Sequence, residues 1–277
     1  MFNDMSLREF NRRFSSDDDC RQYLFNIKWK NGFCCRKCGY GLAYPGETRF
    51  HQRCQSCDYG ESVTAGTLFH KIKFPLLKAF GIAFAVTVRK KGMSTLELAR
   101  SFSIRQSTAW LFKRKLQEAM RSGRPLLSGE KLEVHEIIIG GAGREKQSRF
   151  KGSEKRARIS IQIKGRKLGS GWAEVMETGS SQESETEKKE KAKTARVQQK
   201  KKAGKNLKKC ISSDIVIMNL RNWLSGIHHH CSGRFVQGYL HEFFFRFNRR
   251  SNLKGIWHQL IETMMSQQPY FYKPSEA

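Results

Sequence analysis

Acidic residues are scarce in this sequence. Its 277 residues include 25 Asp and Glu against 52 Lys and Arg, which gives a formal net charge of +27 at pH 7. Such a basic excess favours a polyanionic partner, and nucleic acid is the commonest one because each neutralised phosphate releases a counterion. A basic surface that is merely solvated is the alternative, but the excess is too lopsided to favour it.

Long apolar runs are also missing. No segment approaches the ~20 apolar residues that a membrane-spanning helix needs, and the charged start "MFNDMSLREFNRRF" lacks the apolar core of a secretion signal. We therefore expect a cytoplasmic protein without a membrane partner. The eight cysteines would then lie in a reducing compartment, where metal binding is favoured over disulfide formation.

Four of the cysteines form two CxxC turns. "CRKC" (Cys35 to Cys38) and "CQSC" (Cys54 to Cys57) are separated by 15 residues, a spacing typical of zinc ribbons. Together they predict a closed four-sulfur zinc site, which is structural because it leaves no open position for catalysis. Unrelated buried cysteines are the alternative. Cys34 could compete with Cys35, although only Cys35 makes CxxC with Cys38.

Composition and periodicity predict an α+β protein of several domains. The expected segments are N-terminal helices over 1–30, a zinc ribbon over 31–70, a helical region over 74–122, strand-like runs within 131–178, a Lys-rich segment over 179–210 and a helical, aromatic part over 211–272. From Glu183 to Lys209 there is no aromatic residue. That segment cannot bury enough surface to order itself, so we expect it to be flexible or a solvent-exposed helix.

The helical region over 74–122 contains the pattern of a helix-turn-helix. In "GMSTLELARSFSIRQSTAWLFKRKL", Ser94 as N-cap with Glu97 three residues on predicts a capping box, and "SFSI" supplies the turn. Beside a zinc ribbon and a large positive charge, this pattern favours DNA contact. An ordinary helical pair with Trp110 and Phe112 in its core is the alternative.

Several polar residues are candidates for DNA contact. The start of the second helix of a helix-turn-helix contacts base edges, which in this sequence means Arg105, Gln106 and Ser107. Phosphate contacts are expected from basic residues further along that helix and near the other end of the chain: Lys113, Arg114, Lys115, Arg249 and Arg250.

A histidine interrupts the alternation of "LEVHEIIIGG" (132–141), which is typical of a strand. Glu133, His135 and Ile137 fall on one face, and Val134 and Glu136 fall on the other. His135 is therefore a functional residue, an ordinary packed histidine, or the replacement of some other residue.

Several of these stretches resemble a family of bacterial mobile-element proteins, the ISXO-type insertion-sequence transposases. "RCQSCDYGESVTAGTLFHKIKFPLLKAF" resembles their zinc-ribbon head, and "KKGMSTLELARSFSIRQSTAWLFKRKLQEAM" resembles the helical region after that head. "LEVHEIIIGG" resembles the opening strand of their catalytic domain, and "IVIMNLRNWLSGIHHHCSGRFVQGYLHEFFFRFNRR" resembles its closing portion. The resemblance covers about 5 to 178 and 211 to 272.

The resemblance implies a ribonuclease-H-like α/β domain with an acidic triad, made of two Asp plus an Asn or Glu. Such a site holds two divalent ions, and Mg²⁺ prefers carboxylate oxygens. The family's first strand reads Val-Asp-Glu, so His135 occupies the place of the first catalytic Asp. Asn219 matches the third position, with Arg221 as a basic helper.

The residues around His135 do not replace the missing Asp in an obvious way. Imidazole is a poor ligand for Mg²⁺. Glu136 points to the opposite face of the strand, and Glu133 shares the face but lies about 6.6 Å along the strand. Asp214 and Glu242 are carboxylates of the closing part whose places do not match the family's second ligand.

The family's second Asp lies in a Thr-Asp segment that this sequence lacks. Between Lys191 and Ser213 there is no Asp or Glu, and the region is several dozen residues short, so the ribonuclease-H-like domain is expected to be truncated. A deletion or a shift of reading frame between about Gly179 and Lys209 would explain this. A neighbouring frame of the gene should then encode the missing motif.

Three functions are compatible with these observations. The first is a bacterial, nucleoid-associated transposase by descent that keeps its DNA-binding head and no longer cuts DNA. The second is an active enzyme that recruits Glu133 or Glu136 and Asp214 as Mg²⁺ ligands with Asn219. The third is a non-catalytic regulator or inhibitor of an intact transposase. All three bind the element's terminal inverted repeats or target DNA, as a homo-oligomer or with an intact relative.

Overall fold

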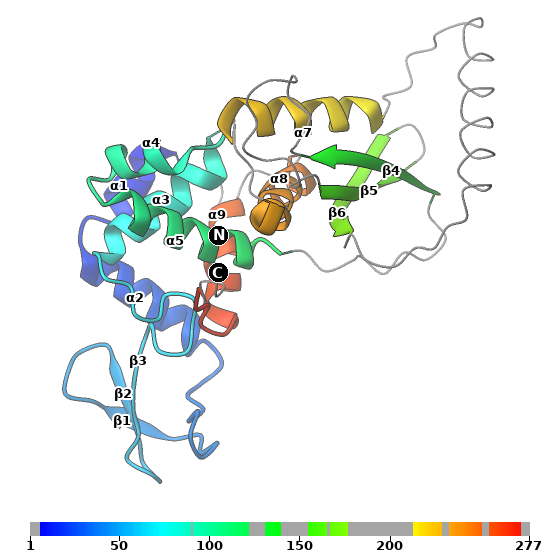
Figure 1. Ribbon diagram of the computed structural model, residues 1–277. Coiled ribbons are helices and arrows are strands. Elements are labelled where there is room, and N and C mark those ends of the chain that lie inside the picture. Colours follow the sequence, from blue (N-terminus) through cyan, green and yellow to red (C-terminus); the bar gives the residue numbers. More distant parts are fainter. Residues whose placement is uncertain are drawn as a thin grey trace, which may run out of the picture. The chain divides into compact units, whose positions relative to one another are not determined.

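The computed structural model describes residues 6–89, 91–121, 131–139, 155–164, 167–176, 213–228, 233–250 and 255–272. Within these ranges it contains helices and two small antiparallel sheets (Figure 1). Contacts divide the chain into two compact units, the first made of Met1–Arg124, Trp223–His229 and Gly238–Ala277 and the second of Pro125–Asn222 and His230–Gln237. No helix in the described ranges is both long enough and apolar enough to span a membrane.

The first unit begins with two capped helices, α1 (Leu7–Arg13) and α2 (Asp17–Lys28). Ser6 and Ser16 are their N-caps, and each forms a reciprocal capping box with the residue three positions on, Glu9 and Asp19 respectively. The capping serines satisfy backbone amides that have no partner inside the helix, so each serine fixes the start of its helix, and both helices lie within the predicted range 1–30.

The zinc-ribbon sheet follows as β1 (Ala43–Pro45), β2 (His51–Cys54) and β3 (Gly60–Ser62), in the order β1-β2-β3 and antiparallel throughout. A buried ion pair attaches this sheet to α2, because Glu61 of β3 is 1% exposed and lies 2.7 Å from Lys28 Nζ. Lys28 also donates to the carbonyls of Ser62 and Ala65, at 2.7 and 2.9 Å.

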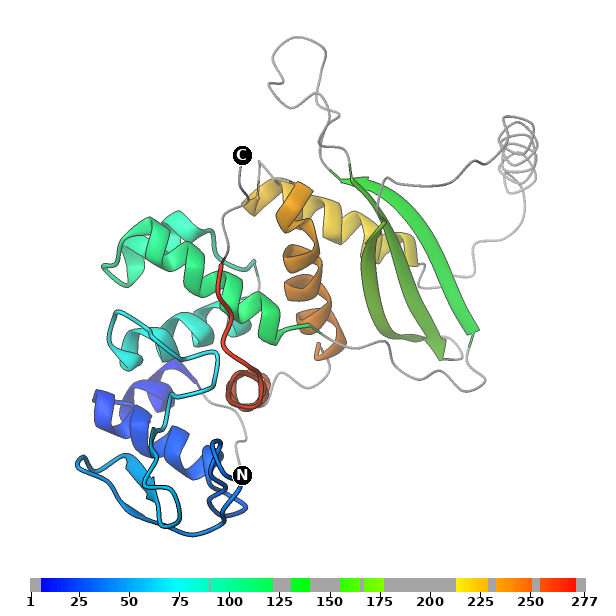
Figure 2. The ribbon, with the colours of Figure 1, turned by 60° about the horizontal axis from the view of Figure 1, so that its bottom comes forward.

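The helical body consists of α3 (Leu76–Val88), α4 (Thr95–Ser101), α5 (Gln106–Ala119) and, from the far end of the chain, α9 (Ile256–Ser266). α3 is apolar on nearly every side and lies in the core. Figure 2 looks down the axis of α9, which contacts α2, α3 and α5. Trp257 of α9 is 2% exposed and its ring lies 5.2 to 5.7 Å from those of Phe10, Phe14, Tyr23 and Phe80.

The second unit contains the sheet β4 (Lys131–Ile139), β5 (Lys155–Lys164) and β6 (Lys167–Met176). The strands are antiparallel in the order β4-β5-β6, with His135 opposite Ile159 and Ile159 opposite Ala173. One face of the sheet is apolar and buried at Ile137, Ile159 and Ile161. All three strands lie within the range 131–178 for which the sequence predicts strand-like runs.

The C-terminal part is shared between the two units. It contains α7 (Ser213–Ile227), a short 3-10 helix η1 (Gly233–Phe235) and α8 (Val236–Asn248), followed by α9. Residues up to Asn222 belong to the second unit, whereas Gly238–Ala277 belongs to the first. The sequence groups 211–272 as one part, but most of it packs with the N-terminal helices because the buried side chains of α9 complete their core.

Candidate metal centre and nucleic-acid interface

The two CxxC turns have the same backbone conformation. In each turn the amide of the first cysteine donates to a carbonyl five residues on: Cys35 N to Tyr40 O at 2.9 Å, and Cys54 N to Tyr59 O at 3.0 Å. The residue after the second cysteine is left-handed, with φ of 77° at Gly39 and 59° at Asp58. Gly and Asp tolerate that conformation better than most residues, so both turns are encoded locally.

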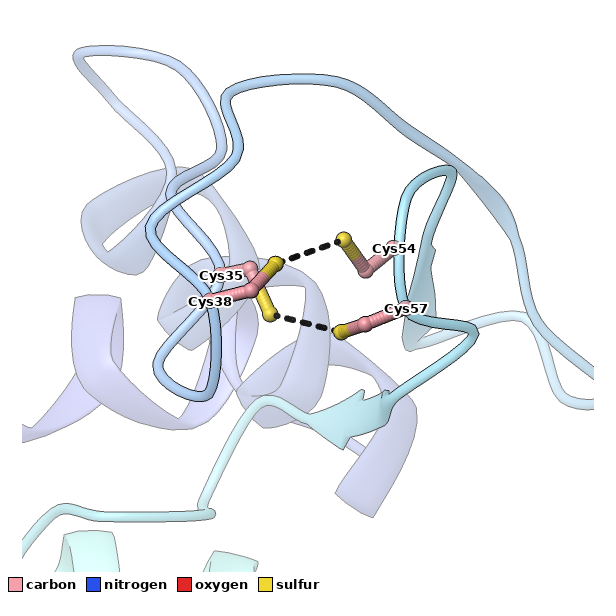
Figure 3. Close-up of side chains that lie close together, drawn as sticks. All are labelled: Cys35, Cys38, Cys54 and Cys57. Atoms are coloured by element: carbon pink, nitrogen blue, oxygen red, sulfur yellow. Dashed lines mark hydrogen bonds between the residues drawn. The ribbon is translucent and has the colours of Figure 1, made fainter.

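The four thiols converge on one point (Figure 3). Cys35 Sγ lies 3.6 Å from Cys57 Sγ, Cys38 Sγ lies 3.5 Å from Cys54 Sγ, and all four sulfurs lie within 4.8 Å of one another. A tetrahedron of sulfurs each about 2.3 Å from zinc has edges of about 3.8 Å, so the arrangement fits a zinc ion. Cys34 is exposed and contacts the carbonyl of Gly39, so Cys35 and not Cys34 belongs to the four-thiol cluster.

Proton affinity differs sharply among these thiols. Burial raises the pKa of Cys35, but the amides of Cys38 and Lys37 and hydrogen bonds from neighbouring thiols lower it to about 7. The Tyr59 amide lowers the pKa of Cys57, but burial and the other three thiols raise it to about 12. With these pKa values the four sulfurs would not all be thiolates at neutral pH, and a bound zinc ion would supply the positive charge that favours their ionised form.

The helix-turn-helix pattern is folded as two helices joined by a short turn. Ser94 accepts from the Glu97 amide at 3.2 Å, as predicted, whereas the Glu97 carboxylate pairs with Arg89 at 2.7 Å. Arg105 is the N-cap residue of α5. Arg105, Gln106 and Ser107 are exposed in the first turn, where they are accessible to a duplex.

The basic residues further along α5 are placed differently from the sequence-based expectation. Lys113 is 0% exposed, lies 3.3 Å from Glu242 and donates to the carbonyl of Met93 at 2.7 Å. Arg114 is 5% exposed, with its guanidinium 4.5 Å from the centre of the Tyr239 ring. Half-buried Lys115 donates to the carbonyl of His70 at 2.9 Å. This corrects the assignment of Lys113 and Arg114 to phosphates, because neither side chain reaches solvent.

The two arginines after α8 also make internal contacts. Arg249 donates to Gln259 Oε1 at 2.7 Å and lies 3.7 Å from the centre of the Phe245 ring. Arg250 is exposed, although it donates to the carbonyl of Phe247 at 2.8 Å. Arg250 is therefore the more accessible of the two to a phosphate.

His135 lies on the face of β4 that also carries buried Ile137 and Ile139. Its Nε2 lies 2.7 Å from Ser213 Oγ at the start of α7 and 3.9 Å from Glu133 Oε2. Glu136 is on the opposite, exposed face, 3.4 Å from Arg158 on β5. The face of His135 thus carries one carboxylate, and Ser213 is a partner that sequence spacing could not reveal.

The other expected triad residues do not join His135. Asn219 follows Ser213 by six residues, about 9 Å along a helix, and is exposed whereas Ser213 and Val216 are buried. Arg221 and Asp214 are exposed too. Glu242 is fully buried beside Lys113 in the first unit. Within the described ranges, the four cysteines are the one group of three or more His, Cys, Asp or Glu side chains arranged to hold a metal.

Comparisons with protein families identify two segments. Residues 15–60 match the transposase zinc-ribbon domain of the IS1595 type, and residues 179–248 match the ISXO2-like transposase domain. The second match includes the Lys-rich segment, whose structure lies outside the described residues, and it does not include 131–178. No curated protein and no solved structure matches the chain.

Proposed function

By its two matched domains the chain is an insertion-sequence transposase of the IS1595 type, and we propose that it binds the DNA of such an element with an impaired strand-cleaving site. The ribbon and the α4–α5 pair form the DNA-binding head, with terminal inverted repeats and target DNA as its partners. Exposed Arg105, Gln106 and Ser107 support contact of α5 with base edges.

Zinc fits the ribbon site and has a structural role there. The four thiolates would fill its tetrahedral coordination and leave no position for a substrate, so zinc would fold the module without taking part in strand cleavage. The amide hydrogen bonds of the two turns orient the thiolates.

The observation that carries the impairment is the identity and environment of residue 135. A two-ion site needs carboxylate oxygens that bridge or flank the ions. The face of β4 instead presents an imidazole bonded to Ser213, and Glu133 is the carboxylate that this face of the described strand carries. These residues do not fit a pair of Mg²⁺ ions. The ribonuclease-H-like assignment rests on the family resemblance, and the three antiparallel strands are compatible with it.

A cleavage assay on element-end DNA with Mg²⁺ or Mn²⁺ tests this proposal. The unaltered protein is expected to bind the DNA and leave it intact. A His135→Asp variant restores a carboxylate at the first position, so its activity would identify residue 135 as the whole defect. Inactivity of both would place a further defect in the segment of the second ligand. Cleavage by the unaltered protein that disappears in Glu133→Gln or Asp214→Asn would overturn the impairment.

A regulator of an intact relative is the second candidate. Two features of the chain favour this role: the turn Arg105–Ser107 is accessible, and β4 carries His135 where the family has its first Asp. Such a protein would occupy element ends without processing them. Added to a reaction catalysed by an intact relative, it should lower the yield of excised element in proportion to its occupancy of the ends. Unchanged excision at saturating occupancy would contradict this role.

A further inference from the structure

A groove of about 660 Å³ lies within the first unit, between the zinc ribbon and the helices α2 and α3. One wall is the segment 48–51, which leads into β2, and the other is the segment 71–74 before α3. Phe50 and Phe69, 7% and 1% exposed, belong to both the groove lining and the hydrophobic core. The groove has the size of a small-molecule site, for which about 300–1,000 Å³ is usual.

The cations of the groove are better placed for an external anion than its acids are for a cation. Asp17 accepts from the Leu77 amide at 2.9 Å, and Asp17 and Asp18 both pair with Arg21, at 3.6 and 2.7 Å. Arg21 pairs with both carboxylates but balances only one of their two negative charges, so the groove lining, which also carries Arg49 and Lys71, has one more cation than it has acids. Arg49 and Lys71 are exposed at the groove, and neither makes an ion pair with any described residue.

A second, smaller hollow adjoins the groove on the ribbon. It has a volume of about 190 Å³ and is lined by Gly60 and Arg53, while Thr48 and His51 line both hollows. A side chain at Gly60 would meet no atom within 4 Å, so the glycine leaves space on this face. Tyr44 pairs with Arg53 across β1 and β2 and is 39% exposed, so an aromatic ring borders this outer face of the ribbon.

We propose that this track, defined by the groove and the adjoining hollow, holds an unpaired strand at the end of the element's DNA. The inference rests on the proposed DNA-binding function and names which form of DNA the ribbon takes. Unstacked bases would lie against the exposed edges of Tyr44 and half-buried Phe74, while Arg49 and Lys71 would contact the phosphates. Bases inside a duplex are already stacked and would gain nothing from these rings.

Binding to matched DNAs tests the track. The probes are a blunt duplex and the same duplex with a short unpaired tail, compared with the zinc-loaded full chain. The first variant is the double substitution Arg49→Gln, Lys71→Asn, where Asn suits the left-handed backbone of residue 71, φ 54°. A Phe74→Leu variant keeps the packing and removes the ring. The control, Arg8→Gln, Arg12→Gln, removes the same charge from exposed positions on α1.

The wild type is expected to bind the tailed duplex about tenfold tighter than the blunt one, the gain of stacking about one base. The double variant and Phe74→Leu should lose this preference while blunt-duplex binding stays within about twofold, and the control should keep it. Equal binding of both DNAs by the wild type, or a preference that survives in the double variant, would overturn the track. If the protein bound the tailed duplex but not the blunt duplex, the result would support the track and overturn the proposed recognition of duplex DNA. If it bound neither DNA, both proposals would be overturned.

Discussion

Lys113 is a charged residue whose neighbours give it a structural role. Its ammonium group is paired with Glu242, which also accepts from Gln117 Nε2 at 2.7 Å, and all three side chains are buried. Burial lowers the pKa of Lys113, and the charge of Glu242 opposes that shift. The ion pair therefore links α5 to α8. The sequence pattern of α5 alone instead predicts that Lys113 contacts a phosphate.

Removing either charge alone should be costly. Lys113→Met leaves Glu242 buried without its counterion, so we expect the free energy of unfolding to fall by about 3–5 kcal/mol in urea denaturation. The double variant Lys113→Met, Glu242→Met should recover most of the loss. The exposed Lys37→Met serves as control and should change stability by less than about 0.5 kcal/mol. Equal stability of Lys113→Met and this control would show that the pair contributes nothing.

The beginning of α2 is an element whose stability depends on one carboxylate. Asp19 accepts from the amides and hydroxyls of both Ser15 and Ser16, at 2.8 to 3.0 Å. The Ser15 and Ser16 hydroxyls, and then their amides, lower the pKa of Asp19. The four bonds favour the ionised form, so the start of α2 is coupled to pH.

Acidification should weaken the start of α2. Because the folded pKa of Asp19 is lowered, its contribution is complete above the ordinary Asp pKa of about 3.9 and is lost as the pH falls through the folded value. Carboxyl chemical shifts followed by NMR should show Asp19 titrating below the ordinary Asp value. An Asp19→Asn variant should have a shallower loss of thermal stability on acidification. An identical pH dependence in wild type and variant would rule out this coupling.

The zinc ribbon is an element that has little core of its own. It relies on the four-thiol site and on its attachment to α2 through Lys28 and Glu61. The helical body instead contains a continuous aromatic core. Loss of zinc should therefore be a local event.

Chelation of zinc should unfold the ribbon and spare the helices. We expect amide protection to disappear over the strands β1 to β3, while helical circular dichroism changes little and re-added zinc restores protection. Cys57→Ser should behave like the chelated protein, and Cys34→Ser, which changes the neighbouring exposed thiol, should behave like wild type. Collapse of the helical signal on chelation would contradict the independence of the body.

At the scale of the molecule, the first unit, which contains the ribbon and the α4–α5 pair, is built from both ends of the chain. Trp257 lies among rings contributed by α1, α2 and α3, and α9 also contacts α5. The segment matched to the ISXO2-like transposase domain ends at residue 248, the last residue of α8, and α9 follows it in the first unit. The first unit is therefore not an N-terminal module that can be cut off.

A fragment ending at residue 121 should fail to fold cooperatively, because it lacks the side chains that fill its core. Trp257→Ala in the full chain should cost about 3–5 kcal/mol of unfolding free energy. The matched control replaces residues 125–212 with a flexible linker and keeps α9, so it should retain a cooperative transition by circular dichroism. A cooperative, native-like transition of the short fragment would show that the core of the first unit does not need α9.

Local patterns predicted a large share of this protein. The four-cysteine cluster, the cap at Ser94, the strand-like runs within 131–178 and the two helices around "SFSI" depend on residues within a few positions of each other. Their geometry follows from backbone hydrogen bonding and side-chain alternation, which short segments encode. The opposite facing of His135 and Glu136 follows in the same way from strand geometry.

Long-range packing decided the rest. The partner of His135 is 78 residues away, and the buried bond between Gln117 and Glu242 spans 125. Charge and periodicity cannot say whether Lys113 meets water or a carboxylate, because the desolvation that decides it comes from other helices. The four clustered cysteines could be named from spacing alone because each pair lies within one turn, whereas the place of α9 in the first unit and the groove beside the ribbon depend on the packing of distant segments.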